Sequence, residues 1–521
     1  MAATTTPAPG TIRIASGGMR RAGRELAVAP IAPLVSEPAH RYVPFLLASV
    51  ALTLTFGATL GMINLARLTT PYFGGVPPGS VRAHAFVQVF GFVGLFVMGI
   101  ACHVLPRFAG RPLVAPSLTR PILGLQAGGV MTIVAAFMLH GTLIPWVWAA
   151  GSIALVAAGS MFLYVVARTV GGLPATERFG RWVIAGAGWQ VAAASGSLIA
   201  AWRNDVTIVQ ALWPAALWGF AGSWIFGVGR RIFPGFLGWQ PRAPRAEGAA
   251  FVVYQTAVAL SVAAAWPVVP EPPPAIVAAG AVGLLVAVPL FSWCLGVGTR
   301  AQVRHDVARG YQRYVTAGWA WLAVALLMGP LWTLVATLRG SAVPLLVTDF
   351  ARHALAFGFV TQIMMGVATR ILPVFTGNAL WSPRARTAAF YLLNVSVALR
   401  ALEAVVAMGF LPAAWPLIAI AGPPAVAAVA LFALNVVFTI FGRPATAGVA
   451  AAPAVMADRY VGDILKIPGA FELLIEAGFT PLKNPVLRAA MTGGVTLRQA
   501  CALKDVPLDL LVSRLEALQR S

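Results

Sequence analysis

Long apolar segments alternate with short polar connections along most of this chain. A helix needs about 20 mostly apolar residues to cross a bilayer, and twelve segments between residues 43 and 441 meet that requirement. The pattern therefore predicts twelve transmembrane helices. We expect them at about 43–66, 83–106, 121–140, 144–167, 182–202, 208–229, 249–268, 275–298, 314–338, 353–372, 387–410 and 415–441.

One of these apolar segments recurs. Its first copy is Val81–Leu113, and the others are Ala216–Trp239 and Arg352–Leu380. Fixed shifts of 128 and 267 residues align Gly91/Gly219/Gly358, Gly99/Gly227/Gly366, Pro106/Pro234/Pro373, Phe108/Phe236/Phe375 and Gly110/Gly238/Gly377. Self-similarity at fixed shifts indicates repeated units. We expect three parallel four-helix units at approximately 43–170, 182–298 and 314–441, with each copy ending at its proline.

The composition separates this chain from soluble proteins. Hydrophobic residues make up 59% and charged residues 10%, so we expect an all-α membrane protein whose main partner is the lipid bilayer. Residues 1–42 read as a disordered basic tail and 443–457 as a linker. The polar segment 458–521 is expected to be a small soluble helical domain. The net charge of +21 accompanies no nucleic-acid-binding motif.

The arginines predict the orientation. Basic residues concentrate on the cytoplasmic side of membrane proteins, and an inward N-terminus places most of the arginines inside. The outer connections then hold only Arg67, Arg82, Arg203, Arg339 and Arg352. We therefore expect a multi-pass protein of the bacterial inner membrane with both termini in the cytoplasm.

Two histidines share one depth in this topology. His84 precedes Pro106 by 22 residues and His353 precedes Pro373 by 20, which places them ~33 and ~30 Å from those prolines. Measured around the helix axis from the aligned glycines Gly91 and Gly358, the two positions differ by about 200°. Two ligands of one off-centre pocket should differ in this way. Such a pair predicts axial ligation of haem iron. The alternative is a pair of interfacial histidines without a ligand.

Further residues fit a haem beside this pair. Phe86 and Phe357 are candidates for apolar contacts with the macrocycle. Arg82 and Arg352 stand next to the histidines, and guanidinium groups bind carboxylates such as propionates through charge-assisted hydrogen bonds. Contact with lipid head groups, or with Asp349, explains these arginines equally well.

Other charged positions lie within or at the ends of spans. His103 and its aligned equivalents Arg231 and Arg370 predict a basic ring at the inner ends, with a second metal site at His103 as the alternative to a cytoplasmic anchor. Arg400 and Glu403 lie three residues apart inside a span. Ions within a membrane are often functional, although a mutually neutralised structural pair is equally consistent.

The spans resemble the NnrS family across roughly Tyr42–Arg443. The resemblance rests on HAFVQVFGF from His84 with the later PRFAGRPL, and on HALAFGF from His353 with TRILPVFTGNAL. It implies a protein containing haem and copper that is linked to nitric oxide and denitrification stress. The family usually has His-Ala-His in the second span. Here Phe86 occupies the second histidine position, so one expected metal ligand is missing from the pattern that would include copper.

The twelve spans are also distantly similar to subunit I of haem-copper oxidases. In that family a low-spin haem takes histidines from spans two and ten, which His84 and His353 match. The high-spin haem ligand would stand at Ala351, and neither Ala211–Gly229 nor Ala249–Pro267 contains a histidine for copper. No complete binuclear centre is visible, so enzymatic activity is left open.

The C-terminal segment resembles the DUF1858 domain through EAGFTPLKNPVLRAAM and VTLRQACALKDVPLDLLVSRLEAL. Together these features predict a membrane protein with bis-histidine ligation of a b-type haem, acting in the nitric oxide response or in membrane electron transfer. An electron donor or a cytoplasmic protein bound by 458–521 is the expected partner. The alternatives are a permease for a small or metal-bearing molecule and a membrane scaffold acting through the C-terminal domain.

Overall fold

The computed structural model describes residues 40–70, 74–139, 144–171, 178–267, 272–299, 309–442, 454–483, 496–504 and 506–520. Within these residues, twelve helical spans are long and apolar enough to cross a membrane. In order they are α1 (Val43–Leu52) with α2 (Ala58–Thr69), α3 (Pro78–Phe86) with α4 (Leu95–Ala109), α5 (Thr119–Met138), α6 (Ile144–Val170), α7 (Arg178–Trp202), α8 (Val209–Trp213) with α9 (Ser223–Leu237), α10 (Pro244–Ala264), α11 (Pro274–Leu295), α12 (Arg309–Leu326) with α13 (Trp332–Leu338), α14 (Leu345–His353) with α15 (Gln362–Thr376), α16 (Pro383–Arg400) with α17 (Leu402–Ala407), and α18 (Gly422–Ile440) after a 3-10 helix (Pro412–Ala421).

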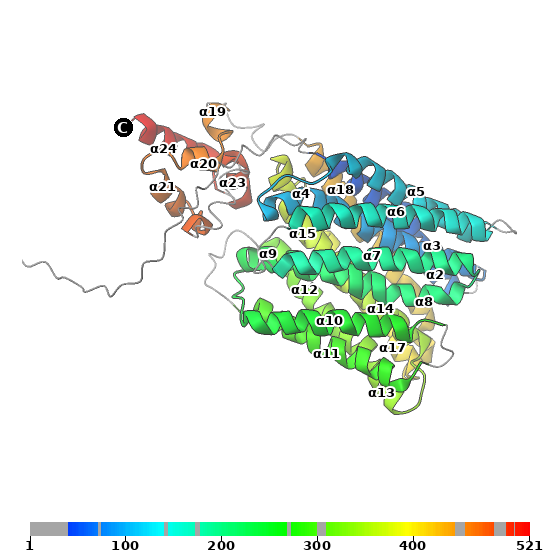
Figure 1. Cartoon of the computed structure of the whole chain (residues 1–521). Coiled ribbons are helices and arrows are strands. Elements are labelled where there is room, and N and C mark those ends of the chain that lie inside the picture. Colours follow the sequence, from blue (N-terminus) through cyan, green and yellow to red (C-terminus); the bar gives the residue numbers. More distant parts are fainter. Residues whose placement is uncertain are drawn as a thin grey trace, which may run out of the picture.

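The spans lie side by side as one bundle (Figure 1). We call the end where α3, α8 and α14 begin the histidine end, because it carries His84 and His353. The opposite end, where α4, α9 and α15 finish, is the proline end, with Pro106, Pro234 and Pro373. Spans two, six and ten therefore run in the same direction.

Spans two, six and ten form the centre of the bundle. Their most apolar windows are 83%, 78% and 78% buried, whereas those of the other nine described spans are 28–50% buried. The outer spans present apolar side chains such as Trp146, Ile153 and Val252 to the surroundings, as expected of helices that face lipid. The recurring sequence segment is therefore the shared core of the fold.

The three central spans carry the same helical irregularity at the aligned position. Each changes from α-helix to π-helix and back. The π segments are Val87–Gly94, Pro214–Gly222 and Ala354–Thr361, and the shifts of 128 and 267 superimpose them to within one residue. Short π segments often mark functional sites in helices.

The aligned glycines allow close contact between neighbouring spans. A Cβ atom at any of the second set of glycines would lie 2.5–2.8 Å from the Cβ of a large residue in the preceding span. The distance is 2.6 Å for Gly99 and Phe45, 2.8 Å for Gly227 and Trp182, and 2.5 Å for Gly366 and Tyr314. Side chains at these positions would push the paired spans apart, which explains why glycine recurs there.

The prolines do not end the central helices. Each helix continues for three residues after its proline and finishes before a glycine with a left-handed backbone, so the expected end at the proline was wrong. These glycines are Gly110, Gly238 and Gly377, with φ of 65°, 68° and 72°. Left-handed glycine is a common way to terminate a helix, and it sets the end of each span here.

A basic–aromatic ring closes the proline end. Each aligned basic residue lies between an aromatic residue of its own unit and the aligned phenylalanine of another unit. His103 contacts Tyr42 and Phe375, Arg231 contacts Phe179 and Phe108, and Arg370 contacts Tyr311 and Phe236. The phenylalanine of the third unit thus contacts the basic residue of the first unit. In the same way the phenylalanine of the first unit contacts the basic residue of the second, and that of the second contacts the basic residue of the third. The expected basic ring is thus joined by six aromatic side chains.

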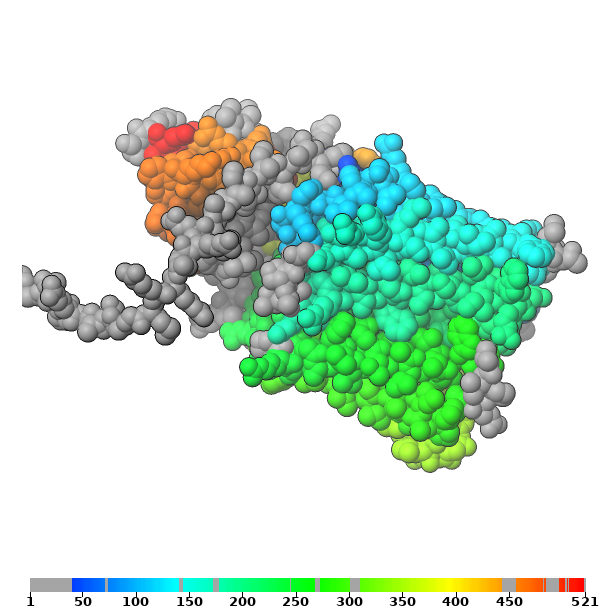
Figure 2. Space-filling model, in the orientation of Figure 1, coloured from blue at the N-terminus to red at the C-terminus, as the bar shows by residue number. Residues whose placement is uncertain are grey.

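The C-terminal domain has a hydrophobic core of its own. It contains α19 (Ala454–Ala457), α20 (Val461–Ile464), α21 (Ala470–Glu476), α23 (Leu497–Lys504) and α24 (Leu508–Arg520), packed around buried residues such as Leu474 and Leu515. It forms a lobe at the proline end (Figure 2). Of the tail expected at 1–42 and the linker expected at 443–457, residues 1–39 and 443–453 lie outside the described residues.

Helix α23 joins this domain to the bundle by packing against α15. Burial, together with the nearby Arg370 guanidinium, lowers the pKa of Lys504. The domain therefore sits beside the basic–aromatic ring, on the central span that carries His353 at its other end.

Candidate functional site

His84 is held by the first span. It lies on α3, and its Nδ1 is 2.8 Å from the backbone oxygen of Gly57. Since a carbonyl oxygen only accepts hydrogen bonds, Nδ1 carries the hydrogen and Nε2 is left with its lone pair. The imidazole rests on Gly61, where a Cβ atom would lie 2.4 Å from the ring carbon Cε1. A glycine at this position is thus required for the ring to lie there.

His353 has a similar environment at the end of α14. Its Nδ1 lies 2.9 Å from the backbone oxygen of Asp349, one turn earlier, and 3.2 Å from Nη2 of Arg400. The shorter contact requires hydrogen on Nδ1, which again leaves Nε2 as the basic nitrogen. The side chain keeps 31% of its surface exposed although it stands within a span.

The structure places both histidines between the first and third units, with Asp349 and Arg400 near each of them. Each imidazole interacts electrostatically with Asp349 and Arg400, and His353 also with His84. Around them α2 packs against α18, and α14 against α17. Residues from the two ends of the membrane domain's sequence thus meet at one site near the histidine end.

A charged cluster lies next to His353. Arg400 forms ion pairs with Asp349 and, at 2.8 Å, with Glu403. The Glu403 side chain is only 2% exposed, and its Oε2 has no hydrogen-bond partner among the residues that the structure describes. The pair expected from spacing is therefore part of a larger cluster that reaches a histidine.

The other candidates are placed differently. Phe86 is buried against Phe90 and Trp213, and two residues of helix turn it about 200° from His84. Phe357 is half-buried and follows His353 by four residues, inside the π segment. Arg82 makes no hydrogen bond or ion pair in the described part of the chain. Arg352 donates to Oε1 of Gln210 at 2.8 Å.

Metal-ligating side chains do not cluster elsewhere in the part of the chain that the structure describes. The described residues contain no group of three or more His, Cys, Asp or Glu side chains that could hold a metal ion. His103 is buried, with its ring centroid 3.7 Å from that of Phe375. Burial raises the pKa of the Cys501 thiol to about 12, so this thiol stays protonated at neutral pH.

Sequence reasoning missed several residues that shape the site. Asp349 was considered only as a partner of Arg352, whereas it contacts both Arg400 and His353. Its position one turn before a histidine in an apolar span was the available signal. Gly57 and Gly61 had no signal, because spans one and two must first be packed before their relation to His84 appears.

Comparison with solved structures gives a likeness to the protein in "Cryo-EM structure of a heme-copper terminal oxidase dimer provides insights into its catalytic mechanism". The sequence identity is 12% and the TM-score 0.48, covering 94% of this chain and 100% of that one. A likeness of this degree assigns neither residues nor chemistry. No curated protein matches this chain.

Two family models match the chain. The model of the domain of unknown function DUF1858 matches residues 457–512, which contain most of the C-terminal domain. The model of the NnrS protein matches residues 35–444 and so covers all twelve spans. This chain belongs to the NnrS family of multi-pass membrane proteins.

Proposed function

We propose that this protein binds a haem in the membrane, with His84 and His353 as axial ligands of the iron. The observation that carries the proposal is that two imidazoles from different spans lie near the same Asp349 and Arg400, each with Nδ1 against a backbone oxygen. Metal-binding histidines usually donate their second ring nitrogen in this way. The partial exposure of His353 inside a span leaves surface for a ligand.

The surrounding residues fix the two rings. The backbone oxygens of Gly57 and Asp349 select the tautomer in which Nε2 is basic. Arg400 binds the Asp349 carboxylate and so steadies the turn of α14 that carries His353. Gly61 admits the His84 ring against the first span. These contacts preorganise two ligands and explain why the site joins the first and third units.

A haem in this site would supply a one-electron redox centre and, if one histidine were displaced, a position for a diatomic ligand. The chain has three separated cysteines and no Cys-x-x-Cys-His motif, which favours a non-covalent b-type haem. Membership of the NnrS family supports a role in the nitric oxide response. Electron transfer in the membrane is the second role that two histidine ligands support.

The proposed setting is the bacterial inner membrane, with the proline end in the cytoplasm. The distribution of arginines supports this orientation. Cysteines introduced singly at exposed positions such as Leu139 and Leu338 test it. An impermeant thiol reagent added to intact spheroplasts is expected to label both, and protection of both residues would contradict the orientation.

Absorption spectroscopy of the purified full-length protein tests the ligation. We expect a Soret band, with iron in a metal analysis. In His84→Ala and His353→Ala the band should shift or weaken strongly, and in the double variant it should disappear. His40→Ala is the matched control, because His40 is exposed at the proline end, and it should leave the spectrum unchanged.

A Soret band that persists in the double variant would overturn the ligation, and a purified protein without haem or iron would overturn the proposed function. Addition of nitric oxide to the reduced protein separates the two roles. A shifted Soret band supports a nitric oxide role, because a histidine must then have been displaced. An unchanged band with reversible reduction supports electron transfer.

A further inference from the structure

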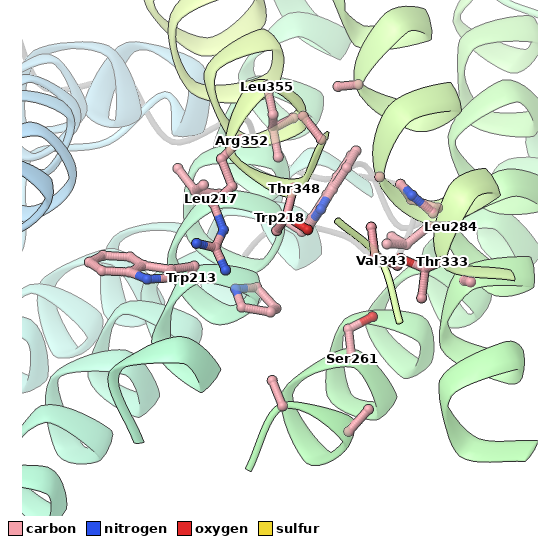
Figure 3. Close-up of a pocket in the computed structure, with 18 of the residues that line it drawn as sticks. Trp213, Leu217, Trp218, Ser261, Leu284, Thr333, Val343, Thr348, Arg352 and Leu355 are labelled. Atoms are coloured by element: carbon pink, nitrogen blue, oxygen red, sulfur yellow. The ribbon is translucent and has the colours of Figure 1, made fainter. Parts of the chain in front are cut away.

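A cavity lies on the other side of span ten from the histidine pair. Its volume is about 430 Å³, and its walls come from spans six to ten near the histidine end (Figure 3). Ala351 and Arg352 of α14 line it, together with Thr348 one turn earlier. These residues lie about 160°, 100° and 140° around the helix from His353. The cavity is therefore separate from the proposed haem site.

Most of the lining is apolar. Trp213, Trp218 and Leu217 contribute from span six, and Leu284 from α11 lies opposite (Figure 3). The hydroxyl groups of the lining residues Ser261 and Thr348 donate to their own helices, to the backbone oxygens of Ala257 and Pro344. A volume in the range of 300–1,000 Å³ with few polar groups is typical of a site for a small molecule.

Arg352 is the charged group in this lining. Its guanidinium extends between Trp213 and Leu217 (Figure 3), and one nitrogen donates to Oε1 of Gln210. Its remaining N–H groups have no acceptor among the described residues. A guanidinium carries five donors and always its charge, and beside an apolar cavity these donors favour an anionic acceptor.

The backbone beside the cavity leaves room as well. The π segment Leu327–Leu331 of span nine places Gly329 and Pro330 in the lining. A Cβ atom on Gly329 would meet nothing closer than the Ala351 side chain at 3.6 Å. Small residues thus keep this wall open between spans nine and ten.

We propose that this cavity binds an amphiphile whose apolar body lies among the tryptophans and leucines and whose carboxylate or phosphate is held by Arg352 and Gln210. Bilayer lipids and long-chain fatty acids share this chemistry. The guanidinium supplies the charge, and Gln210, which accepts from Arg352, has its amide hydrogens left to donate. The site does not depend on haem ligation by His84 and His353.

Photolabelling tests the site in full-length protein reconstituted in nanodiscs. The probe is a palmitic acid that carries a diazirine on its chain. We expect it to label peptides containing Trp218 or Leu284, and unlabelled oleate to compete. In Arg352→Gln the affinity should fall about 10- to 100-fold, the value of a hydrogen bond to a charged group. Arg339→Gln, an exposed arginine at the same end, should bind as the wild type does.

Two further arms make the result specific. Ala281→Phe places a ring in the cavity and should abolish labelling, while size-exclusion chromatography and circular dichroism confirm that the variant is folded. The wild type should bind the methyl ester of the probe about 10- to 100-fold more weakly than the free acid. Arg352→Gln should bind the ester and the acid equally. Competition by lysophosphatidic acid against oleate shows whether phosphate or carboxylate is preferred. Labelling that ignores the head-group charge, or that survives Ala281→Phe, would overturn the inference.

Discussion

The two ends of the bundle differ in how the three units contribute to them. At the proline end, three basic residues and six aromatic residues repeat the same contact around the centre, and every unit contributes equally. At the histidine end this equivalence is lost. His84 and His353 meet between the first and third units, whereas Arg352 lines a cavity between the second and third.

This contrast separates architecture from function. Some contacts recur in every unit, such as the glycine approaches and the left-handed helix ends. The packing of each unit explains them. Residues present in one unit alone have no such explanation. Asp349, His353 and Arg400 belong to this second class, and they form one cluster. Departure from the repeat is therefore the best guide to the site.

The largest expected effect follows from removing the charge that organises the asymmetric end. Arg400→Met leaves the Glu403 carboxylate, 2% exposed, without its partner. Breaking such a buried pair costs about 3–5 kcal/mol, so we expect a strongly lowered melting temperature in detergent together with loss of haem. The double variant Arg400→Met/Glu403→Met should recover most of the stability but not the haem. Equal melting temperatures of the single variant and the wild type would refute the cluster's role.

A smaller effect is expected at a contact common to all units. In Gly366→Ala the new Cβ would lie 2.5 Å from Cβ of Tyr314, and overpacking of this kind destabilises by roughly 1–3 kcal/mol. Gly235→Ala on α9 is the control, since nothing lies within 4 Å of its Cβ. It should be neutral or stabilise by up to about 1 kcal/mol. Thermal melts of both variants give the comparison, and their absorption spectra are expected to match that of the wild type.

The basic–aromatic ring allows a third test. Arg231→Met removes the hydrogen bond to the backbone oxygen of Phe108, at 2.9 Å, and the cation–π contact with Phe179, at 4.8 Å. We expect a loss of about 1–2 kcal/mol in the free energy of unfolding without any change in the absorption spectrum. A spectral change would mean that the ring at the proline end affects the haem site, and it would contradict the separation of a structural end from a functional one.

The smallest expected effect sharpens the same contrast. His103→Arg places in the first unit the residue that the other units already carry between the same kinds of aromatic neighbour, so we expect the smallest change in stability of the four tests. His353→Arg is the matched change at the histidine end, and it should lose haem completely. If both variants keep or both lose the Soret band, the two ends do not differ in their importance for haem binding.

Much of the architecture could be predicted from the sequence. Apolar length indicated the twelve spans, and five aligned positions indicated the repeat. The glycine approaches, the left-handed glycines and the ring give three of those positions a physical reason. The proline was misread as a helix end, because loss of one N–H does not stop a helix that is packed on all sides.

The site could be predicted only in part. Depth can be counted along a helix, and His84 and His353 do lie at the same end of the bundle. Rotation could not be counted, since the estimate of about 200° assumed 100° per residue, and both paths to the aligned glycines cross a π segment. The direction of Arg352, toward Gln210 rather than toward the histidines, was not foreseen because it depends on how span six packs against span ten.

The order in which the ring closes has a consequence for how the chain can be connected. Helices α6 and α11 finish, and α7 and α12 begin, at the same end as the start of α1 and the finish of α18. A circular permutant that begins at Arg178 and joins the old termini through a linker would therefore keep every arginine over its aromatic neighbour. Deletion of one whole unit would instead leave one basic residue of the ring with only the aromatic residue of its own unit.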